Sequence, residues 1–91
     1  MPSGSSAFFG GKMNLKELYN TISENVYFYR TNNLKYGYLT EERLAKLSGI
    51  HINLIRSIEE KRKELVLNIN IINNIANTLD IPVYKFFIKR K

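Results

Sequence analysis

Apolar residues recur at steps of three and four along residues 39–60, which is the spacing of one face of an α-helix. They are Leu44, Leu47, Ile50, Leu54, Ile55 and Ile58. The run is interrupted once, by Ser48 and Gly49, and glycine readily adopts the positive φ that ends a helix. Thr40 is well placed to cap the first helix, with Glu41 in its electropositive first turn. The pattern therefore predicts two short helices joined by a tight glycine turn.

Two further helices are predicted on either side of this pair. Residues 14–32 begin with Asn14 and have Glu17 three positions later, as in a capping box. The inward stripe of this helix is predicted to be Leu15, Leu18, Ile22, Val26 and Tyr29. Residues 68–79, capped by Asn68 and closed by Asp80, have a second apolar face. That face consists of Ile69, Ile72, Ile75, Ala76 and Leu79.

A fifth helix is predicted over residues 82–88, because proline is favoured at the first position of a helix. It contains Phe86 and Phe87, and two adjacent phenylalanines cannot both face the same small core. One of them is therefore expected at an interface. The basic residues 88–91 are expected to fray.

The net charge of the chain restricts the kinds of molecule that it is expected to bind. The chain has 91 residues, 14 Lys and Arg against 8 Asp and Glu, and a formal net charge of +6. This length fits one domain, whose small core would gain from dimerisation. The excess of positive charge suits a polyanion, either nucleic acid or an anionic membrane surface.

Other classes of protein are disfavoured by what the chain lacks. There is no cysteine and a single histidine, which rules out disulfides and argues against a zinc site. No apolar run approaches the ~20 residues of a membrane span, and no signal peptide is visible. We see no phosphate loop, nucleophile–base set or carboxylate pair. We therefore expect a cytoplasmic protein that is not an enzyme, with no cofactor, no small-molecule substrate and no membrane partner.

Residues 1–12 differ in character from the rest, being rich in glycine and serine. We interpret them as a flexible leader, an expression tag with Met13 as the native start; a natural flexible arm is the alternative. Residues 13–91 are then the folded domain.

The pair of short helices resembles the Cro/repressor-type (XRE-like) helix-turn-helix. The residues in register with that motif are Thr40, Glu42, Leu44, Ala45, Gly49, Ile50, Ile55, Ile58 and Glu59. The later sequence LDIPVYKFF looks like the C-termini of restriction–modification controller proteins. The resemblance implies an all-α fold, a compact five-helix lambda-repressor-like DNA-binding domain. It also implies a homodimer that binds double-stranded DNA at an inverted-repeat operator and regulates transcription.

The resemblance also assigns residues to roles. Base reading is expected from Ile52, Asn53, Arg56 and Ser57, and phosphate contacts from Thr40, Glu41, His51, Lys61, Arg62 and Lys63. Asn53 suits adenine, Arg56 suits guanine or a phosphate, and Ile52 suits a thymine methyl group. His51 is expected to be a weak N-cap or a phosphate contact. Arg30 is expected to pair with Glu59, and Val83, Phe86 and Phe87 to form the dimer interface.

The chain departs from the family pattern after Glu60, where Lys61 replaces the usual glycine and the loop is about two residues longer. The helix is therefore expected to continue past Glu60. Alternative functions are a phage Cro-like repressor, an antitoxin, or a protein-interaction module that has lost DNA binding and uses Ile52 and Leu54. Salt separates the last of these from the others, because DNA binding falls steeply with added salt and an apolar protein contact does not.

Overall fold

The computed structural model describes residues 14–60 and 68–90, and all the regular secondary structure in these two ranges is helical. The α-helices are α2 (Leu15–Thr31), α3 (Glu41–Ser48), α4 (Ile52–Glu59) and α6 (Ile69–Leu79), and η1 (Val83–Phe87) is a 3-10 helix. Within the described residues there is no strand, only an isolated bridge between Asn33 and Gly37. The all-α prediction is confirmed in this part of the chain. Residues 1–12 and the predicted phosphate contacts Lys61, Arg62 and Lys63 lie outside it, as does any continuation of α4 past Glu60.

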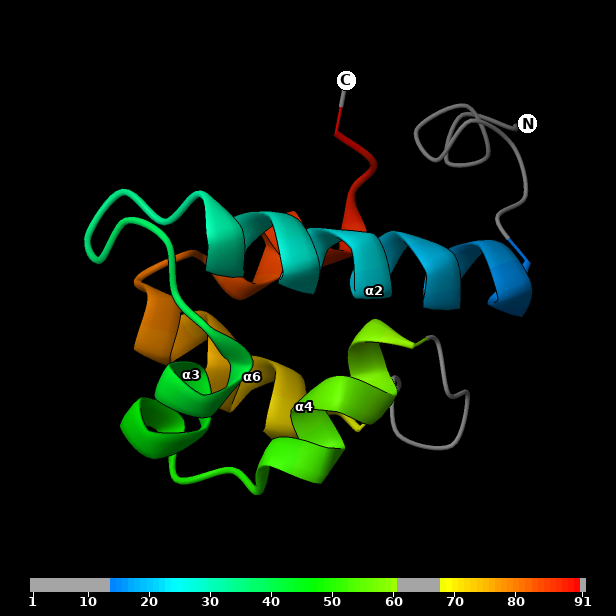
Figure 1. The fold of residues 1–91 in the computed structure, drawn as a ribbon. Helices are drawn as coiled ribbons and strands as arrows, with labels where there is room; N and C mark the ends of the chain where they lie inside the picture. Colours follow the sequence, from blue (N-terminus) through cyan, green and yellow to red (C-terminus); the bar gives the residue numbers. More distant parts are fainter. Residues whose placement is uncertain (1–13, 61–67, 91) are drawn as a thin grey trace.

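Helix α2 is the longest element and organises the others. Figure 1 shows it running along one side of the molecule, with α3, α4 and α6 on the opposite side. It contacts α4, α6 and η1, while α3 packs on α4 and α6. The two short helices are thus supported from behind by α6 and fixed to α2 through α4.

The helix ends follow the predicted caps. Asn14 accepts a hydrogen bond from the Glu17 backbone N–H at 2.8 Å, and Glu17 accepts one from Asn14 N–H at 3.2 Å, which completes the capping box. Thr40 accepts from the backbone N–H of Arg43 at 3.0 Å at the start of α3. Gly49 ends α3 at a φ of 74°. These local contacts fix where α2 and α3 begin and favour the turn at Gly49.

One hydrophobic core joins all five elements. Its fully or almost fully buried members are Ile22, Val26, Leu39, Leu44, Ile50, Ile55, Ile58, Ile72, Ile75, Ala76, Leu79 and Phe86. Two residues predicted to face inward do not: Leu15 is 60% exposed and Ile69 is 54% exposed. Each is the first residue of its helix, so the stripe predicted by periodicity extends one turn beyond the core.

The fifth helix predicted over residues 82–88 is present as the short 3-10 helix η1, not as an α-helix. No side chain caps the start of η1, and its five residues form a 3-10 helix. The carbonyl oxygens of Lys85, Phe86 and Ile88 instead accept hydrogen bonds from the Asn25 side-chain nitrogen at 3.2, 2.9 and 2.9 Å. This amide of α2 therefore fixes the end of the domain in a conformation that local propensity does not predict.

Phe86 was predicted at the dimer interface and is instead in the core. Its side chain is fully buried, and its ring centroid lies 5.2 Å from that of Tyr29. A 3-10 helix has three residues per turn, so adjacent side chains point about 120° apart. Phe86 therefore faces inward while its neighbour Phe87 remains half-buried at the edge of the core. Val83, one turn before Phe86 on the same side of η1, is half-buried as well.

Residues 88–91 were predicted to fray; of these the structure describes residues 88–90, and Arg90 among them makes specific contacts with α2. The Nε of Arg90 donates to the Asn25 side-chain oxygen at 2.9 Å. Its guanidinium carbon lies 3.8 Å from the ring centroid of Phe28, a cation–π contact. A second buried asparagine, Asn33, donates to the carbonyl of Leu79 at 2.7 Å and so joins the loop after α2 to the end of α6.

Candidate nucleic-acid interface

Helices α3 and α4 form the predicted helix-turn-helix, and α4 has one face in the core. Ile55 and Ile58 are fully buried, whereas Asn53 and Arg56 are exposed on the other side of α4. Ile52 and Ser57, also predicted to read bases, are half-buried. The packing of two isoleucines therefore determines which polar side chains of α4 face outward. Leu54 is half-buried against the core.

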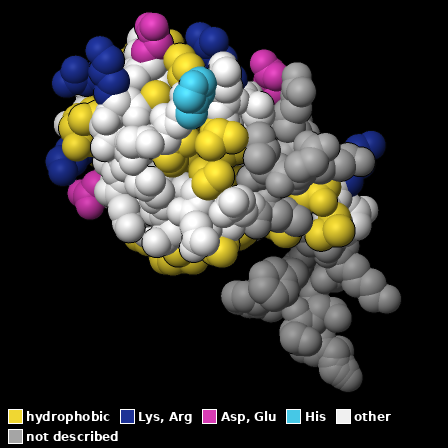
Figure 2. All heavy atoms as spheres, turned by 90° about the horizontal axis from the view of Figure 1, so that it is seen from below, with side chains coloured by type: hydrophobic (Ala, Val, Ile, Leu, Met, Phe, Trp, Pro, Cys, Tyr) yellow, Lys and Arg dark blue, Asp and Glu magenta, His cyan; other side chains and the backbone are white. Residues whose placement is uncertain are grey.

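His51 lies at the start of α4, in the turn between the two helices. Its Nδ1 accepts a hydrogen bond from the backbone N–H of Asn53 at 3.1 Å, so it is the N-cap of this helix. Of the two roles predicted for His51, the structure shows the cap. The side chain is exposed, and in Figure 2 the histidine (cyan) adjoins a hydrophobic area on the side opposite α2.

A shallow depression of about 550 Å³ lies between α3 and the first residues of α4. It is lined by Glu42, Ala45, Lys46, Gly49, Ile50, His51 and Ile52. Small and apolar side chains make up most of its wall. The depression is therefore mostly apolar, and the exposed Asn53 is next in sequence to Ile52 in its wall.

The pair predicted between Arg30 and Glu59 is present and anchors the end of α4. Arg30 donates from Nε and Nη2 to the two carboxylate oxygens of Glu59 at 2.7 and 2.8 Å, and from Nη1 to the carbonyl of Leu39 at 2.7 Å. The two side chains are only 6% and 8% exposed. Ser23 adds a hydrogen bond to the carbonyl of Ile58 at 2.6 Å. The orientation of α4 on α2 thus depends on a bidentate ion pair and one hydroxyl group.

Burial and the charge of the partner shift the pKa of each member of this pair in opposite directions. Burial lowers the pKa of Arg30, but the hydrogen bonds and charge of Glu59 outweigh it, so the guanidinium pKa is raised above its ordinary value. Burial also raises the pKa of Glu59, against the opposing effect of Arg30, and the neighbouring Glu41 carboxylate adds to the rise. The Glu59 carboxylate therefore depends on Arg30 to remain charged at this buried position.

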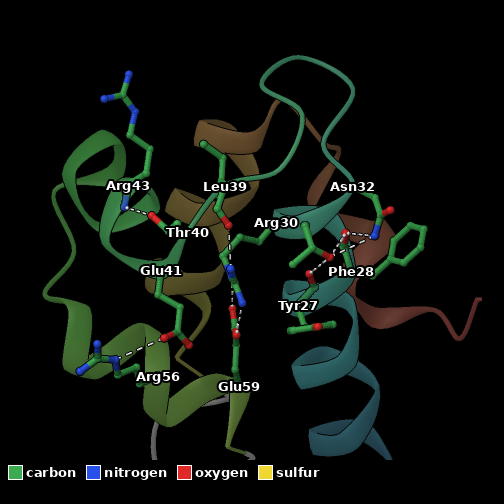
Figure 3. A network of polar contacts seen from close by, with 11 residues as sticks. Tyr27, Phe28, Arg30, Asn32, Leu39, Thr40, Glu41, Arg43, Arg56 and Glu59 are labelled. Atoms are coloured by element: carbon green, nitrogen blue, oxygen red, sulfur yellow. Dashed lines mark hydrogen bonds and ion pairs between the residues drawn. The ribbon is translucent and has the colours of Figure 1, made fainter.

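Arg56 on α4 forms an ion pair with α3, the preceding helix. Its Nε donates to Oε1 of Glu41 at 3.2 Å, and the two side chains are 51% and 29% exposed. Figure 3 shows Glu41 pointing from α3 toward Arg56 on α4, beside the Arg30–Glu59 pair. Glu41 and Thr40, both predicted at phosphates, are thus engaged within the protein, Glu41 with Arg56 and Thr40 with the N–H of Arg43.

Two contacts of this region were not expected from the sequence. One is the Glu41–Arg56 pair, and the other is a hydrogen bond from the side chain of Asn74 on α6 to the carbonyl of Ser48 at 3.0 Å. The second supports the end of α3, next to the glycine turn. An exposed asparagine on a helix gives no sequence signal for such a contact, because the same residue is common on solvated faces.

Two negative findings apply to the part of the chain that the structure describes. No group of three or more His, Cys, Asp or Glu side chains is placed to hold a metal ion. No helix there is long and apolar enough to cross a membrane.

Comparison with known proteins places the chain in a family. No protein-family model matches it, and no solved structure matches it. It is 35% identical over 78 residues to Control protein C.SmaI of Serratia marcescens, an alignment that covers 86% of this chain and 82% of that protein. The chain belongs to the restriction–modification controller proteins, members of the Cro/repressor-type (XRE-like) helix-turn-helix family.

Proposed function

We propose that the protein is a sequence-specific transcriptional regulator of a restriction–modification system, which binds an inverted-repeat operator as a homodimer. The observation that carries this proposal is the two-sided α4. Ile55 and Ile58 hold it in the core, and Asn53 and Arg56 project from its opposite face. A helix presented in this way can enter the major groove, where base edges are distinguishable. The family membership supports a regulator rather than an enzyme.

Affinity and specificity come from different groups in this proposal. The net charge of +6 favours binding to phosphates with release of counterions, which supplies most of the sequence-independent affinity. Thr40 and His51, at the starts of α3 and α4, remain proposed phosphate neighbours. Lys61, Arg62 and Lys63 stay a prediction for the same role.

Base preference is assigned to the exposed face of α4. Asn53 can make a bidentate contact with adenine and Arg56 with guanine, while Ser57 can address either donors or acceptors. Ile52 is half-buried at the edge of the apolar depression. A thymine methyl group in that depression would contact it from the groove.

The homodimer is proposed to form through the region of η1. Tyr84 and Ile88 are 58% and 51% exposed, which leaves large apolar side chains at the surface there. Val83 and Phe87 are half-buried beside them. These four residues, without Phe86, are the proposed interface. A two-fold dimer would place two α4 helices about 34–36 Å apart, one turn of DNA.

The experiment that tests the function is selection from a random duplex library with the purified protein at moderate salt, followed by sequencing. We expect an enriched inverted repeat, and an affinity for it that falls steeply as salt is raised. Retention of DNA without any consensus would contradict sequence-specific regulation.

Replacing Asn53 or Arg56 with alanine should cost ~1–3 kcal/mol of binding to the selected operator and relax the base preference at one position of each half-site. Asn77→Ala is the matched control, because Asn77 is an exposed asparagine on α6. Binding can be measured by titration of a labelled duplex. If both substitutions on α4 behave like the control, the assigned reading face is wrong.

Phe87→Ala should weaken the dimer more than it weakens the fold of the protomer, because the side chain is only half-buried within one chain. Sedimentation at several protein concentrations should show a larger fraction of monomer than for the unmodified protein. An unchanged monomer–dimer distribution would remove Phe87 from the interface.

A further inference from the structure

We propose that Glu41 positions Arg56 so that the end of its guanidinium group meets a guanine base. The inference rests on the proposed function and deepens it, since it chooses between guanine and phosphate as the target of Arg56. Glu41 would then affect DNA recognition through Arg56 and without touching the DNA itself. The contact that carries it joins the first residue of α3 to the middle of α4.

The atoms used in this contact leave the reading end of the arginine available. Glu41 accepts from Nε of Arg56, at 3.2 Å. In the described part of the chain, Nη1 and Nη2 of Arg56 have no hydrogen-bond partner, and the side chain is 51% exposed. Guanine offers two adjacent acceptors, O6 and N7, which an arginine reads with two parallel N–H groups. Arg56 is therefore held at one side, with its terminal pair of nitrogens directed outward.

The position of the Glu41 carboxylate is determined by its surroundings. Thr40 caps α3 and fixes its first turn, where the helix dipole favours a negative charge. On the inner side lies Glu59, whose negative charge repels Glu41 and is already paired with Arg30. Arg56 is the cation on the outer side. The carboxylate is 29% exposed, so it is partly shielded from solvent.

Orientation matters more for a base than for a phosphate. A phosphate presents oxygens in several directions, and a freely rotating arginine can reach one of them. A bidentate contact with guanine requires the guanidinium plane to lie in the plane of the base. Fixing Nε lowers the number of rotamers that Arg56 loses when it binds, and this favours the guanine contact over the alternatives.

The test uses the full chain and a random duplex library, with the enriched sequences counted for the unmodified protein, the double variant Glu41→Ala/Arg56→Ala and four single variants. These are Glu41→Ala, Arg56→Ala, Arg56→Lys and, as the charge-matched control, Asp80→Asn. Asp80 is exposed at the end of α6, and asparagine tolerates its positive φ, so the control changes the net charge by the same amount as removal of Glu41. Arg56→Lys keeps the charge and loses the pair of terminal nitrogens. Thermal unfolding of each variant shows whether the fold is retained.

We expect Arg56→Ala to abolish a guanine preference at one position of each half-site, and Arg56→Lys to weaken it, because lysine reaches guanine without the planar pair of nitrogens. Glu41→Ala should lower the same preference ~2- to 5-fold, the range expected for loss of an exposed ion pair. It should not change the other positions. Asp80→Asn should leave every base preference unchanged and only strengthen binding to duplexes in general. The double variant Glu41→Ala/Arg56→Ala should match Arg56→Ala, because the two residues act through one contact.

Equal behaviour of Glu41→Ala and Asp80→Asn would overturn the inference, since Glu41 would then act only through its charge. So would a consensus in which Arg56→Ala changes no guanine position. Both outcomes leave the proposed function standing, because the unmodified protein still selects an operator. If the unmodified protein selects no consensus, the proposed function fails and this inference fails with it.

Discussion

Replacing Arg30 with alanine should lower the free energy of unfolding by about 3–5 kcal/mol, the usual cost of removing one partner of a buried ion pair. The substitution removes three hydrogen bonds, two to Glu59 and one to the carbonyl of Leu39. It also leaves the Glu59 carboxylate buried without a counter-charge. Small domains are typically stable by only ~5–15 kcal/mol, so the loss should be visible in a urea titration.

The cost should depend on pH. Without Arg30, burial would raise the pKa of Glu59 further above its ordinary value, because the opposing charge is gone. The folded variant then binds a proton more tightly than the unfolded chain does. Its stability should therefore rise as the pH falls from the raised pKa toward the unfolded pKa, and the gap to the unmodified protein should narrow.

Glu59→Gln is the matched control for this experiment. It keeps a side-chain oxygen that can accept from Arg30 and carries no titratable group at position 59. We expect it to lose stability as well, because the buried Arg30 guanidinium then has no counter-charge, but without the pH dependence of the Arg30 variant. The difference in unfolding free energy between Arg30→Ala and the unmodified protein should narrow with falling pH. A difference that stays constant from pH 7 to about pH 4.5 would contradict the view that Glu59 is left charged without a partner.

Phe86→Ala should cost about 3–5 kcal/mol of unfolding free energy, as expected for removing a large ring from a packed core. The side chain is fully buried and lies against Tyr29, so its removal leaves a void beneath η1. Denaturant unfolding should show this loss at every protein concentration, because the ring packs within one protomer.

Phe87→Ala provides the contrast in the same experiment. Its loss should be smaller and should depend on protein concentration, since a weakened dimer stabilises the folded state less. If the two variants lose the same free energy with the same concentration dependence, the inward and outward assignments of these neighbours are wrong.

Much of the helix-turn-helix could be predicted from the sequence because its determinants are local. Thr40 and Gly49 fix the ends of α3 by contacts within a few residues, and the apolar period of α4 predicts that Ile55 and Ile58 face inward. The Arg30–Glu59 pair followed from resemblance to a family, not from spacing. Periodicity alone does not identify a partner 29 residues away.

What could not be predicted depends on polar contacts between distant segments. Asn25 lies among the apolar residues of α2 and gives no local sign that three carbonyl groups around η1 will bind its amide. Without that contact, Pro82 and the following residues are typical of an α-helix start. The contact of Glu41 with Arg56 could not be predicted for a similar reason, because the helix dipole already explains an acidic residue in the first turn of a helix.

The amide of Asn25 also bears on when the protein can fold during synthesis. Its carbonyl partners lie 60 to 63 residues further along the chain, and Phe86 is among them. A ribosome that has released only α2 to α6 has produced a chain without the ring that completes the core. The buried amide of α2 then has none of these partners. Because such long-range contacts form late, the DNA-binding helices should acquire their final packing only after residues 85–90 have emerged.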